Sequence, residues 1–208
     1  MNLTDVKHTL RAARIEKNAS LMLLVFSGAL AAPGRPRWTA VLAAAVATLL
    51  GSMLVTQLNQ LTDAAIDLGE KRRITADFLR NRKASWRVVQ SELLGLVLAL
   101  TAVWTLATWT TLVGVCAFLT FSTLYSYNFL SASPVERRWK AHWFTHALAF
   151  CGAYLSLWIA GFATRSVSEA RAVVPWFLVA SASDYLVYLV ETGLDRHEES
   201  RARMQTLA

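Results

Sequence analysis

The sequence predicts an all-α membrane protein: a polytopic bundle of about six transmembrane helices that forms a single integral membrane domain over residues 1–208. Hydrophobic residues make up 55% of the 208 residues, and the mean hydropathy is +0.37. These residues come in long uncharged blocks, and no residue between Leu93 and Ser133 carries a charge. A membrane helix needs about 20 apolar residues, so this block alone is long enough for two spans.

The apolar blocks define six predicted spans in chain order, at about 19–32, 38–61, 93–110, 113–130, 142–164 and 172–190. A basic stretch precedes the first block, which ends at Ala31-Ala-Pro-Gly without the small-residue pattern of a cleavage site. We therefore expect a first span there instead of a cleaved signal peptide. The two main connections are expected at 62–92 and 131–141.

Basic residues are distributed unequally between the two sides of the predicted membrane. Only four of the 21 Lys and Arg residues fall on one side, namely Arg35, Arg37, Arg165 and Arg171. Because positive charge accumulates in cytoplasmic loops, we expect both termini and both main connections to face the cytoplasm. The expected location is the cytoplasmic membrane, with the lipid bilayer as a partner and no nucleic acid.

Two acidic clusters lie at cytoplasmic ends of predicted spans. The first consists of Asn59, Asp63 and Asp67, at positions i, i+4 and i+8. The second consists of Asp184, Glu191 and Asp195, at positions i, i+7 and i+11. Each spacing places its members on one face of a helix. Ionisable groups in or beside a membrane span are costly and therefore indicate function. Carboxylates that face each other across a cavity suit Mg²⁺ that also holds a phosphate.

A basic segment follows the first acidic cluster and includes Lys71, Arg72 and Arg80. Carboxylates, Mg²⁺ and basic side chains together form a charge-balanced clamp for a diphosphate. For any single cation, the positive-inside pattern and anionic lipid headgroups are an equally good explanation. They do not explain why acidic residues recur at helical spacing at the ends of two separate spans.

These motifs together resemble the UbiA superfamily of intramembrane prenyltransferases. The segment from Asn59 to Asp67, with its basic loop, resembles the first family motif, and Asp184 to Asp195 resembles the second. Two weaker stretches agree. Arg14-Ile-Glu-Lys17 resembles the Arg-Leu-x-Lys stretch at the first helix, and Tyr125-Ser126 with Pro134 and Lys140 resembles a Tyr-Ser…Pro…Lys stretch. The motifs follow the family's order and cover about residues 11–200.

The resemblance implies Mg²⁺-dependent transfer of an isoprenyl group from an isoprenyl diphosphate to a hydrophobic or aromatic acceptor. The residues it would place on the metal are Asp63, Asp67, Asp184, Glu191 and Asp195. Asn59 would assist them, and Tyr125 would line the reacting centre. The residues it would place on the diphosphate are Lys71, Arg72, Arg80 and Lys140. Arg14 would meet a polar acceptor.

The resemblance also implies that ionisation of the isoprenyl diphosphate gives a carbocation. Aromatic rings on the spans are candidates for shielding this cation from water, because ring faces stabilise cations. The candidates are Trp104, Trp109, Phe118, Phe121, Tyr125, Phe144 and Trp158. For any one ring on a span, a packing or lipid-facing role is the commoner one.

The sequence departs from the family pattern in three respects. Gln60 stands where the first motif commonly has Asp, and Glu191 stands where Asp is usual; both keep an oxygen ligand. Family members usually have nine spans, so we expect the last three family helices, and with them part of the wall of the membrane-embedded groove for the isoprenyl tail, to be absent. A shortened subfamily, a wall supplied by another chain and a degenerate remnant are the three alternatives. One hypothesis is that a homo-oligomer closes the groove. Two alternative functions stay open: a membrane-bound terpene cyclase that needs no acceptor, and a non-catalytic subunit that binds a lipid diphosphate.

Overall fold

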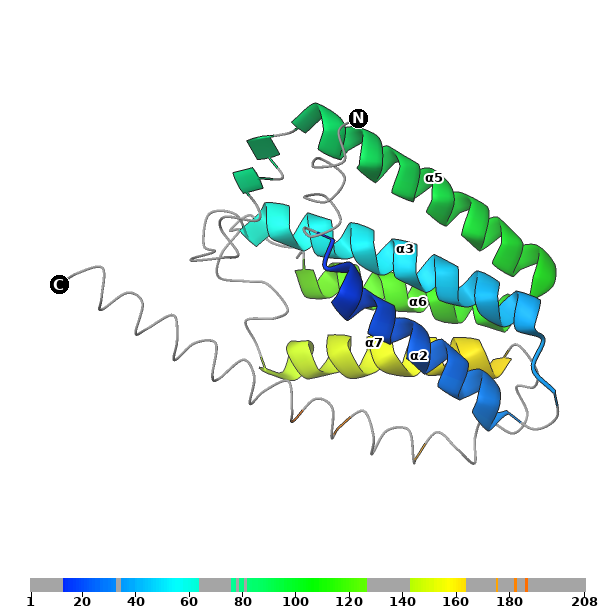
Figure 1. Cartoon of the computed structure of the whole chain (residues 1–208). Helices are drawn as coiled ribbons and strands as arrows, with labels where there is room; N and C mark the ends of the chain where they lie inside the picture. The colour runs from blue at the N-terminus through cyan, green and yellow to red at the C-terminus, as the bar shows by residue number, and fades with distance from the viewer. Residues whose placement is uncertain are drawn as a thin grey trace.

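The computed structural model describes residues 13–32, 35–63, 76–77, 79–80, 82–126 and 143–163, with three single residues beyond them. Within these ranges the chain forms the helices α2 (Ile15–Ala31), α3 (Trp38–Asp63), α5 (Arg82–Leu106), α6 (Trp109–Ser126) and α7 (Trp143–Ala163) (Figure 1). The described part contains no strand. The predicted all-α class is therefore confirmed.

The connections between helices follow from local sequence. Pro36 lies between α2 and α3, and proline fixes φ and lacks an amide hydrogen, so neither helix continues through the connection. Between α5 and α6 the chain turns at Ala107 and Thr108. There the Thr111 amide donates to Thr108 Oγ1 (3.3 Å), which caps the beginning of α6. The Thr108 hydroxyl also donates to the Ala163 carbonyl (2.8 Å), which ties this turn to the end of α7.

Helix α5 begins earlier than the apolar block on which the third span was predicted. It starts at Arg82, so the expected connection at 62–92 includes the first turns of this helix. The reason is physical: hydropathy marks only the part of a helix that is apolar, whereas backbone hydrogen bonding continues into the polar flank. The apolar part of α5 runs from Trp86 to Leu106 and includes Glu92.

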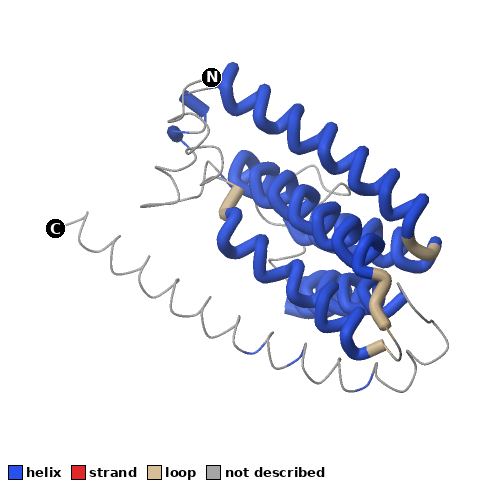
Figure 2. Tube along the Cα trace, turned by 45° about the vertical axis from the view of Figure 1, so that its right-hand side comes forward, coloured by secondary structure: helices blue, strands red, loops and turns tan. Residues whose placement is uncertain are grey.

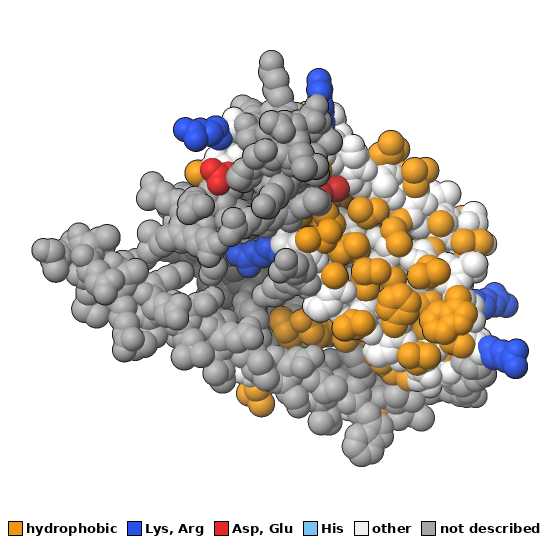
Figure 3. All heavy atoms as spheres, viewed as in Figure 1, with side chains coloured by type: hydrophobic (Ala, Val, Ile, Leu, Met, Phe, Trp, Pro, Cys, Tyr) orange, Lys and Arg blue, Asp and Glu red, His pale blue; other side chains and the backbone are white. Residues whose placement is uncertain are grey.

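Two described helices are long and apolar enough to cross a bilayer, over Trp38–Asn59 in α3 and Trp86–Leu106 in α5. Three shorter apolar helices accompany them, over Asn18–Ala31, Trp109–Leu124 and Leu148–Ala163. Apolar side chains cover much of the described surface on the right of Figure 3, and basic side chains lie toward the two ends. The six-span count stays a prediction, because the expected span at 172–190 lies outside the described residues apart from three isolated positions.

Small residues let the helices approach closely. A Cβ added at Gly161 of α7 would collide with the Val25 carbonyl of α2, and one added at Gly28 of α2 would collide with the Trp158 carbonyl. Small residues at helix interfaces are typical of membrane bundles, where van der Waals packing drives helix association. The core enclosed between the helices includes Val25, Phe118 and Leu157.

The alternating helix directions bring five helix termini to one end of the bundle. The beginnings of α2, α5 and α7 and the ends of α3 and α6 lie at this end (Figure 1). The connections from α2 to α3 and from α5 to α6 lie at the other end (Figure 2). We call the first of these the motif end, because α3 reaches it at Asp63.

Candidate active site at the motif end

The first acidic cluster begins in the last two turns of α3. Asn59 is half-buried, and Asp63 is the last residue of the helix. Ser52 and Thr56 precede them at spacings of four and three residues, so these four positions follow one face of α3 toward the motif end. The backbone therefore places Asn59 and Asp63 on one face, as their spacing predicted.

Helix α2 is joined to this face by a buried asparagine that was not among the predicted site residues. Asn18 is 6% exposed, and its Nδ2 donates to Thr56 Oγ1 of α3 (2.9 Å) and to the Ala13 carbonyl (2.6 Å). The contact joins α2 to α3 one turn before Asn59. The only sequence signal for Asn18 is a single amide at the start of an apolar run. Such a signal does not indicate which residue the amide contacts.

Arg14 lies at the beginning of α2 in an unusual backbone conformation. Its φ of 47° and ψ of 50° are left-handed, and its carbonyl accepts a hydrogen bond from the Asn18 amide (3.0 Å). This conformation costs a residue with a Cβ about 1–2 kcal/mol. The two hydrogen bonds of Asn18 to the neighbouring backbone, at Ala13 and Arg14, offset that cost. Because α2 and α3 run in opposite directions, Arg14 and Asn59 lie at similar levels near the motif end.

The remaining predicted site residues fall into three groups. Arg80 is described and exposed, in the connection that leads from α3 to α5. Tyr125 is the second-last residue of α6, so its backbone is at the motif end, although its side chain is outside the described part. The residues that lie wholly outside the described part are Asp67, Lys71, Arg72, Lys140, Asp184, Glu191 and Asp195.

Two further buried polar residues lie between α3 and α5. Gln57 is 3% exposed and Glu92 is 6% exposed. Their side chains are near each other, yet none of their four polar side-chain atoms makes a hydrogen bond of ordinary geometry. Neither residue was among the predicted site residues. The available signal was Glu92 itself, a carboxylate that directly precedes the uncharged block and lies within the apolar part of α5.

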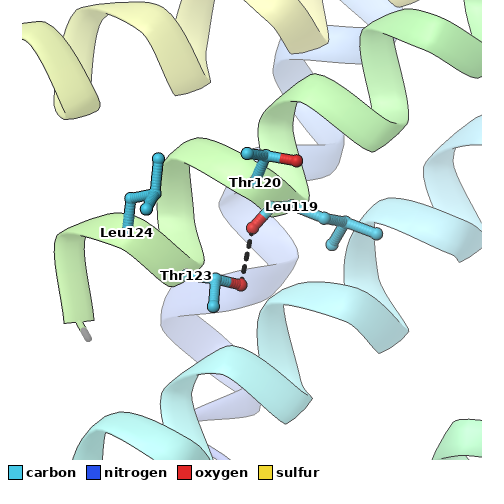
Figure 4. A pocket seen from close by; sticks show the side chains of 4 residues that line it. All are labelled: Leu119, Thr120, Thr123 and Leu124. Carbon is cyan, nitrogen blue, oxygen red and sulfur yellow. Dashed lines mark hydrogen bonds between the residues drawn. The ribbon is translucent and has the colours of Figure 1, made fainter. Parts of the chain in front are cut away.

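A shallow cavity of about 280 Å³ lies on α6, lined by Leu119, Thr120, Thr123 and Leu124 (Figure 4). The threonine hydroxyls donate to carbonyls of their own helix, Thr123 to Leu119 (2.7 Å) and Thr120 to Cys116 (2.9 Å). Their methyl groups are what remains to line the cavity, which is therefore largely apolar. Leu119 extends toward α3, where Gly51 leaves room for its side chain.

Four of the candidate rings do not lie at the motif end as surfaces for a carbocation. Trp158 is 5% exposed in a buried cluster near the end of α7, away from the motif end. Phe118 is 2% exposed within the core, where neighbouring side chains already enclose it. Trp104 and Trp109 are 66% and 71% exposed, beside the turn at the opposite end of the bundle. Their bulk faces outward, as expected of rings in contact with lipid at a membrane interface.

Two of the predicted site residues at the motif end carry oxygen groups that suit a divalent cation such as Mg²⁺. Asn59 offers an amide oxygen and Asp63 a carboxylate, and Mg²⁺ prefers hard oxygen ligands. Among the described side chains, no group of three His, Cys, Asp or Glu residues forms a metal site. Four of the five predicted metal ligands, Asp67, Asp184, Glu191 and Asp195, lie beyond the described part.

Comparison with known proteins gives one match. The sequence model of the UbiA prenyltransferase family matches residues 20–208. No curated protein and no solved structure matches the chain significantly.

Proposed function

The chain belongs to the UbiA prenyltransferase family, and from this premise we propose that it is a Mg²⁺-dependent intramembrane prenyltransferase. It would transfer an isoprenyl group from an isoprenyl diphosphate to a hydrophobic or aromatic acceptor. Family membership itself implies an integral membrane protein with prenyltransferase-type activity. The substrates, the metal and the residue roles are our proposal.

The observation that carries the proposal is the shared location of four assigned positions. Asn59 and Asp63 at the end of α3, Arg14 at the beginning of α2 and Tyr125 near the end of α6 all lie at the motif end. The three helices that carry them are separate in sequence, and the alternating helix directions bring these positions to one end. A diphosphate site at the membrane surface needs this arrangement, because its polar head must meet metal ligands while its tail stays in lipid.

The metal ligands in this proposal are Asp63, Asp67, Asp184, Glu191 and Asp195, with Asn59 assisting through its amide oxygen. When bound, Mg²⁺ would supply positive charge that stabilises the leaving diphosphate. Lys71, Arg72, Arg80 and Lys140 would bind diphosphate oxygens through charge-assisted hydrogen bonds. Arg14 would orient a polar group of the acceptor.

In the reaction, the bond between the isoprenyl C1 and the diphosphate oxygen breaks, and its electron pair leaves with the diphosphate. The acceptor then forms a bond to C1 and loses a proton. Tyr125 would line this centre, and the apolar bundle would exclude water from it. The apolar cavity beside Leu119 and Thr123 supports this proposal, since it offers an isoprenyl tail a surface on α6, the helix that carries Tyr125 near its end.

The direct test is diphosphate release by the purified protein in nanodiscs, with C10, C15 and C20 isoprenyl diphosphates and either Mg²⁺ or EDTA. We expect Mg²⁺-dependent release when a membrane extract or aromatic acceptor is added. Asp63→Ala and Asp184→Ala should abolish it. Asp77→Ala, which removes a carboxylate with no assigned role from the connection between α3 and α5, should not.

The same assay separates the alternatives. Release without any acceptor, with formation of a hydrocarbon or terpene alcohol, would identify a terpene cyclase. Mg²⁺-dependent donor binding with no release from any donor would contradict the enzyme proposal and identify a lipid-diphosphate-binding subunit. Chemical crosslinking in the membrane would test whether a second copy of the chain closes the groove.

A further inference from the structure

Gln57 and Glu92 pose a physical problem within the bundle. Both are more than nine-tenths buried, and both lie in the apolar parts of their helices, Trp38–Asn59 in α3 and Trp86–Leu106 in α5. The oxygen and nitrogen of the Gln57 amide and both carboxyl oxygens of Glu92 have no hydrogen-bond partner of ordinary geometry. Unpaired buried polar atoms are costly, and an unpaired buried charge is far more so.

Protonation of the Glu92 carboxylate would give all four of these polar atoms a hydrogen-bond partner. A neutral carboxylic acid has one O–H donor and one carbonyl acceptor, and a primary amide has the complementary pair. Facing each other, the two groups can exchange two hydrogen bonds: the acid O–H donates to the amide oxygen, and the amide N–H donates to the acid carbonyl. An ionised Glu92 has only acceptors, so it would leave the Gln57 oxygen unpaired.

We propose that Glu92 is a neutral carboxylic acid paired with the Gln57 amide, and that this pair positions the end of α3 that carries Asn59 and Asp63. The positioning role rests on the proposed function, whereas the pairing itself does not. Glu92 would act on the motif through Gln57 and α3, so we class it as a positioning residue.

The pair lies where it can position the end of α3. Gln57 follows Thr56, which Asn18 of α2 holds from the neighbouring side of α3. Polar contacts from α2 and α5 thus hold α3 at one level, just before Asn59. Helix α5 packs mainly on α3 and only slightly on α6. Among the described side chains, the pair is a buried polar contact between α5 and α3, and it would set how α5 lies against α3.

The test uses the whole chain with four variants of the pair and one control variant. Glu92→Gln keeps a neutral group that can still exchange two hydrogen bonds with Gln57. Glu92→Leu and Gln57→Leu each remove one partner, and the double variant removes both. Gln90→Leu is the matched control, because Gln90 lies on the same part of α5 but is exposed.

Three measurements decide the outcome. Infrared spectroscopy at neutral pH should show the carbonyl stretch of a protonated carboxylic acid in the parent protein and in Gln90→Leu, and should not show it in Glu92→Gln. Thermal unfolding should be unchanged in Glu92→Gln and Gln90→Leu, and lowered in each single Leu variant. The double variant should lose less than the two single losses added together.

The third measurement addresses positioning. Mg²⁺-dependent binding of an isoprenyl diphosphate should weaken about tenfold in Glu92→Leu, as is typical when a group that orients metal ligands is lost. Glu92→Gln should restore it. A purely structural role would lower thermal stability in Glu92→Leu without changing donor affinity in the folded protein.

Opposite results overturn the inference. Absence of the acid carbonyl band would show that Glu92 is ionised. Loss of stability in Glu92→Gln equal to that in Glu92→Leu would show that a neutral pair with Gln57 does not stabilise the bundle. If the parent protein binds no donor at all, the proposed function fails, and the infrared and unfolding measurements still decide the pairing.

Discussion

At the scale of single residues, the described part of the site is organised by amides and carboxyls inside apolar helices. Asn18, Gln57, Asn59 and Glu92 lie near the motif end, and three of these four are more than nine-tenths buried. Buried polar groups need partners, and Asn18 meets this need by joining α2 to α3 through Thr56.

Asn18→Ala should lower the free energy of unfolding by about 1–3 kcal/mol, because the Thr56 hydroxyl and the Ala13 carbonyl both lose a donor. Denaturant unfolding in detergent would measure this. Ser27→Ala is the control, since the Ser27 hydroxyl is exposed and donates to Leu24 within its own helix. Its effect should stay within about 0.5 kcal/mol, and equal losses in the two variants would contradict a joining role for Asn18.

Asp63→Asn should reduce Mg²⁺-dependent diphosphate release at least about 100-fold, because the loss of a single preorganised group at a site of developing charge has effects of this size. The release assay described above measures it. Asp77→Asn, with the same chemical change in the connection after α3, should keep the parent rate. An unchanged rate in Asp63→Asn would remove Asp63 from the proposed metal site.

At the scale of helices, backbone contacts through glycine determine the arrangement. The sequence marked the apolar blocks, but it did not indicate which face of each helix meets which neighbour. Helix α6 has no strong polar side to orient it, because almost all of its residues are apolar or small.

Gly161→Ala and Gly95→Ala make the same chemical change in two different surroundings. At Gly161 the new methyl group meets the backbone of Val25, whereas at Gly95 it meets only the flexible end of the Leu50 side chain. Gly161→Ala should lower the free energy of unfolding by about 1–3 kcal/mol or more. Gly95→Ala should be neutral or stabilising, since Ala favours a helix over Gly by about 0.5–1 kcal/mol. Thermal unfolding of both variants decides this, and equal effects would contradict close packing of α2 on α7.

Thr108→Val should lower the free energy of unfolding by about 1–2 kcal/mol, because it removes the cap of α6 and the hydrogen bond to the Ala163 carbonyl. The control is Thr105→Val, since the Thr105 hydroxyl is exposed and bonds only to its own helix. If denaturant unfolding shows the same small change in both, the turn does not depend on Thr108.

At the scale of the whole molecule, alternating helices bring distant motif residues to one end, and the distribution of basic residues predicts that this end faces the cytoplasm. Single cysteines test the orientation in a background in which Cys116 and Cys151 are replaced by Ala. In intact cells, Arg35→Cys should react with a membrane-impermeant thiol reagent, and Asp77→Cys should react only after the membrane is opened. The reverse pattern would overturn the predicted orientation.

How much of this was predictable differs between fold and site. Long uncharged blocks alone predicted helices, because a chain in lipid must satisfy its backbone hydrogen bonds within each segment. The spacing of Asn59 and Asp63 predicted a shared face, and the structure confirms this for the backbone. The early beginning of α5 was not predictable from hydropathy, because the polar turns at its start carry no apolar signal.

The sequence by itself determined the helical class, the acidic motifs and the family, since each is recorded in local composition and spacing. Only the tertiary structure decided that Asn18 meets Thr56, that Gln57 faces Glu92, and that Gly161 packs against Val25. These contacts join residues between 35 and 136 positions apart along the chain. Local patterns contain no information about such pairs, because the pairs depend on how whole helices rotate and slide against each other until small residues and buried polar groups find their partners.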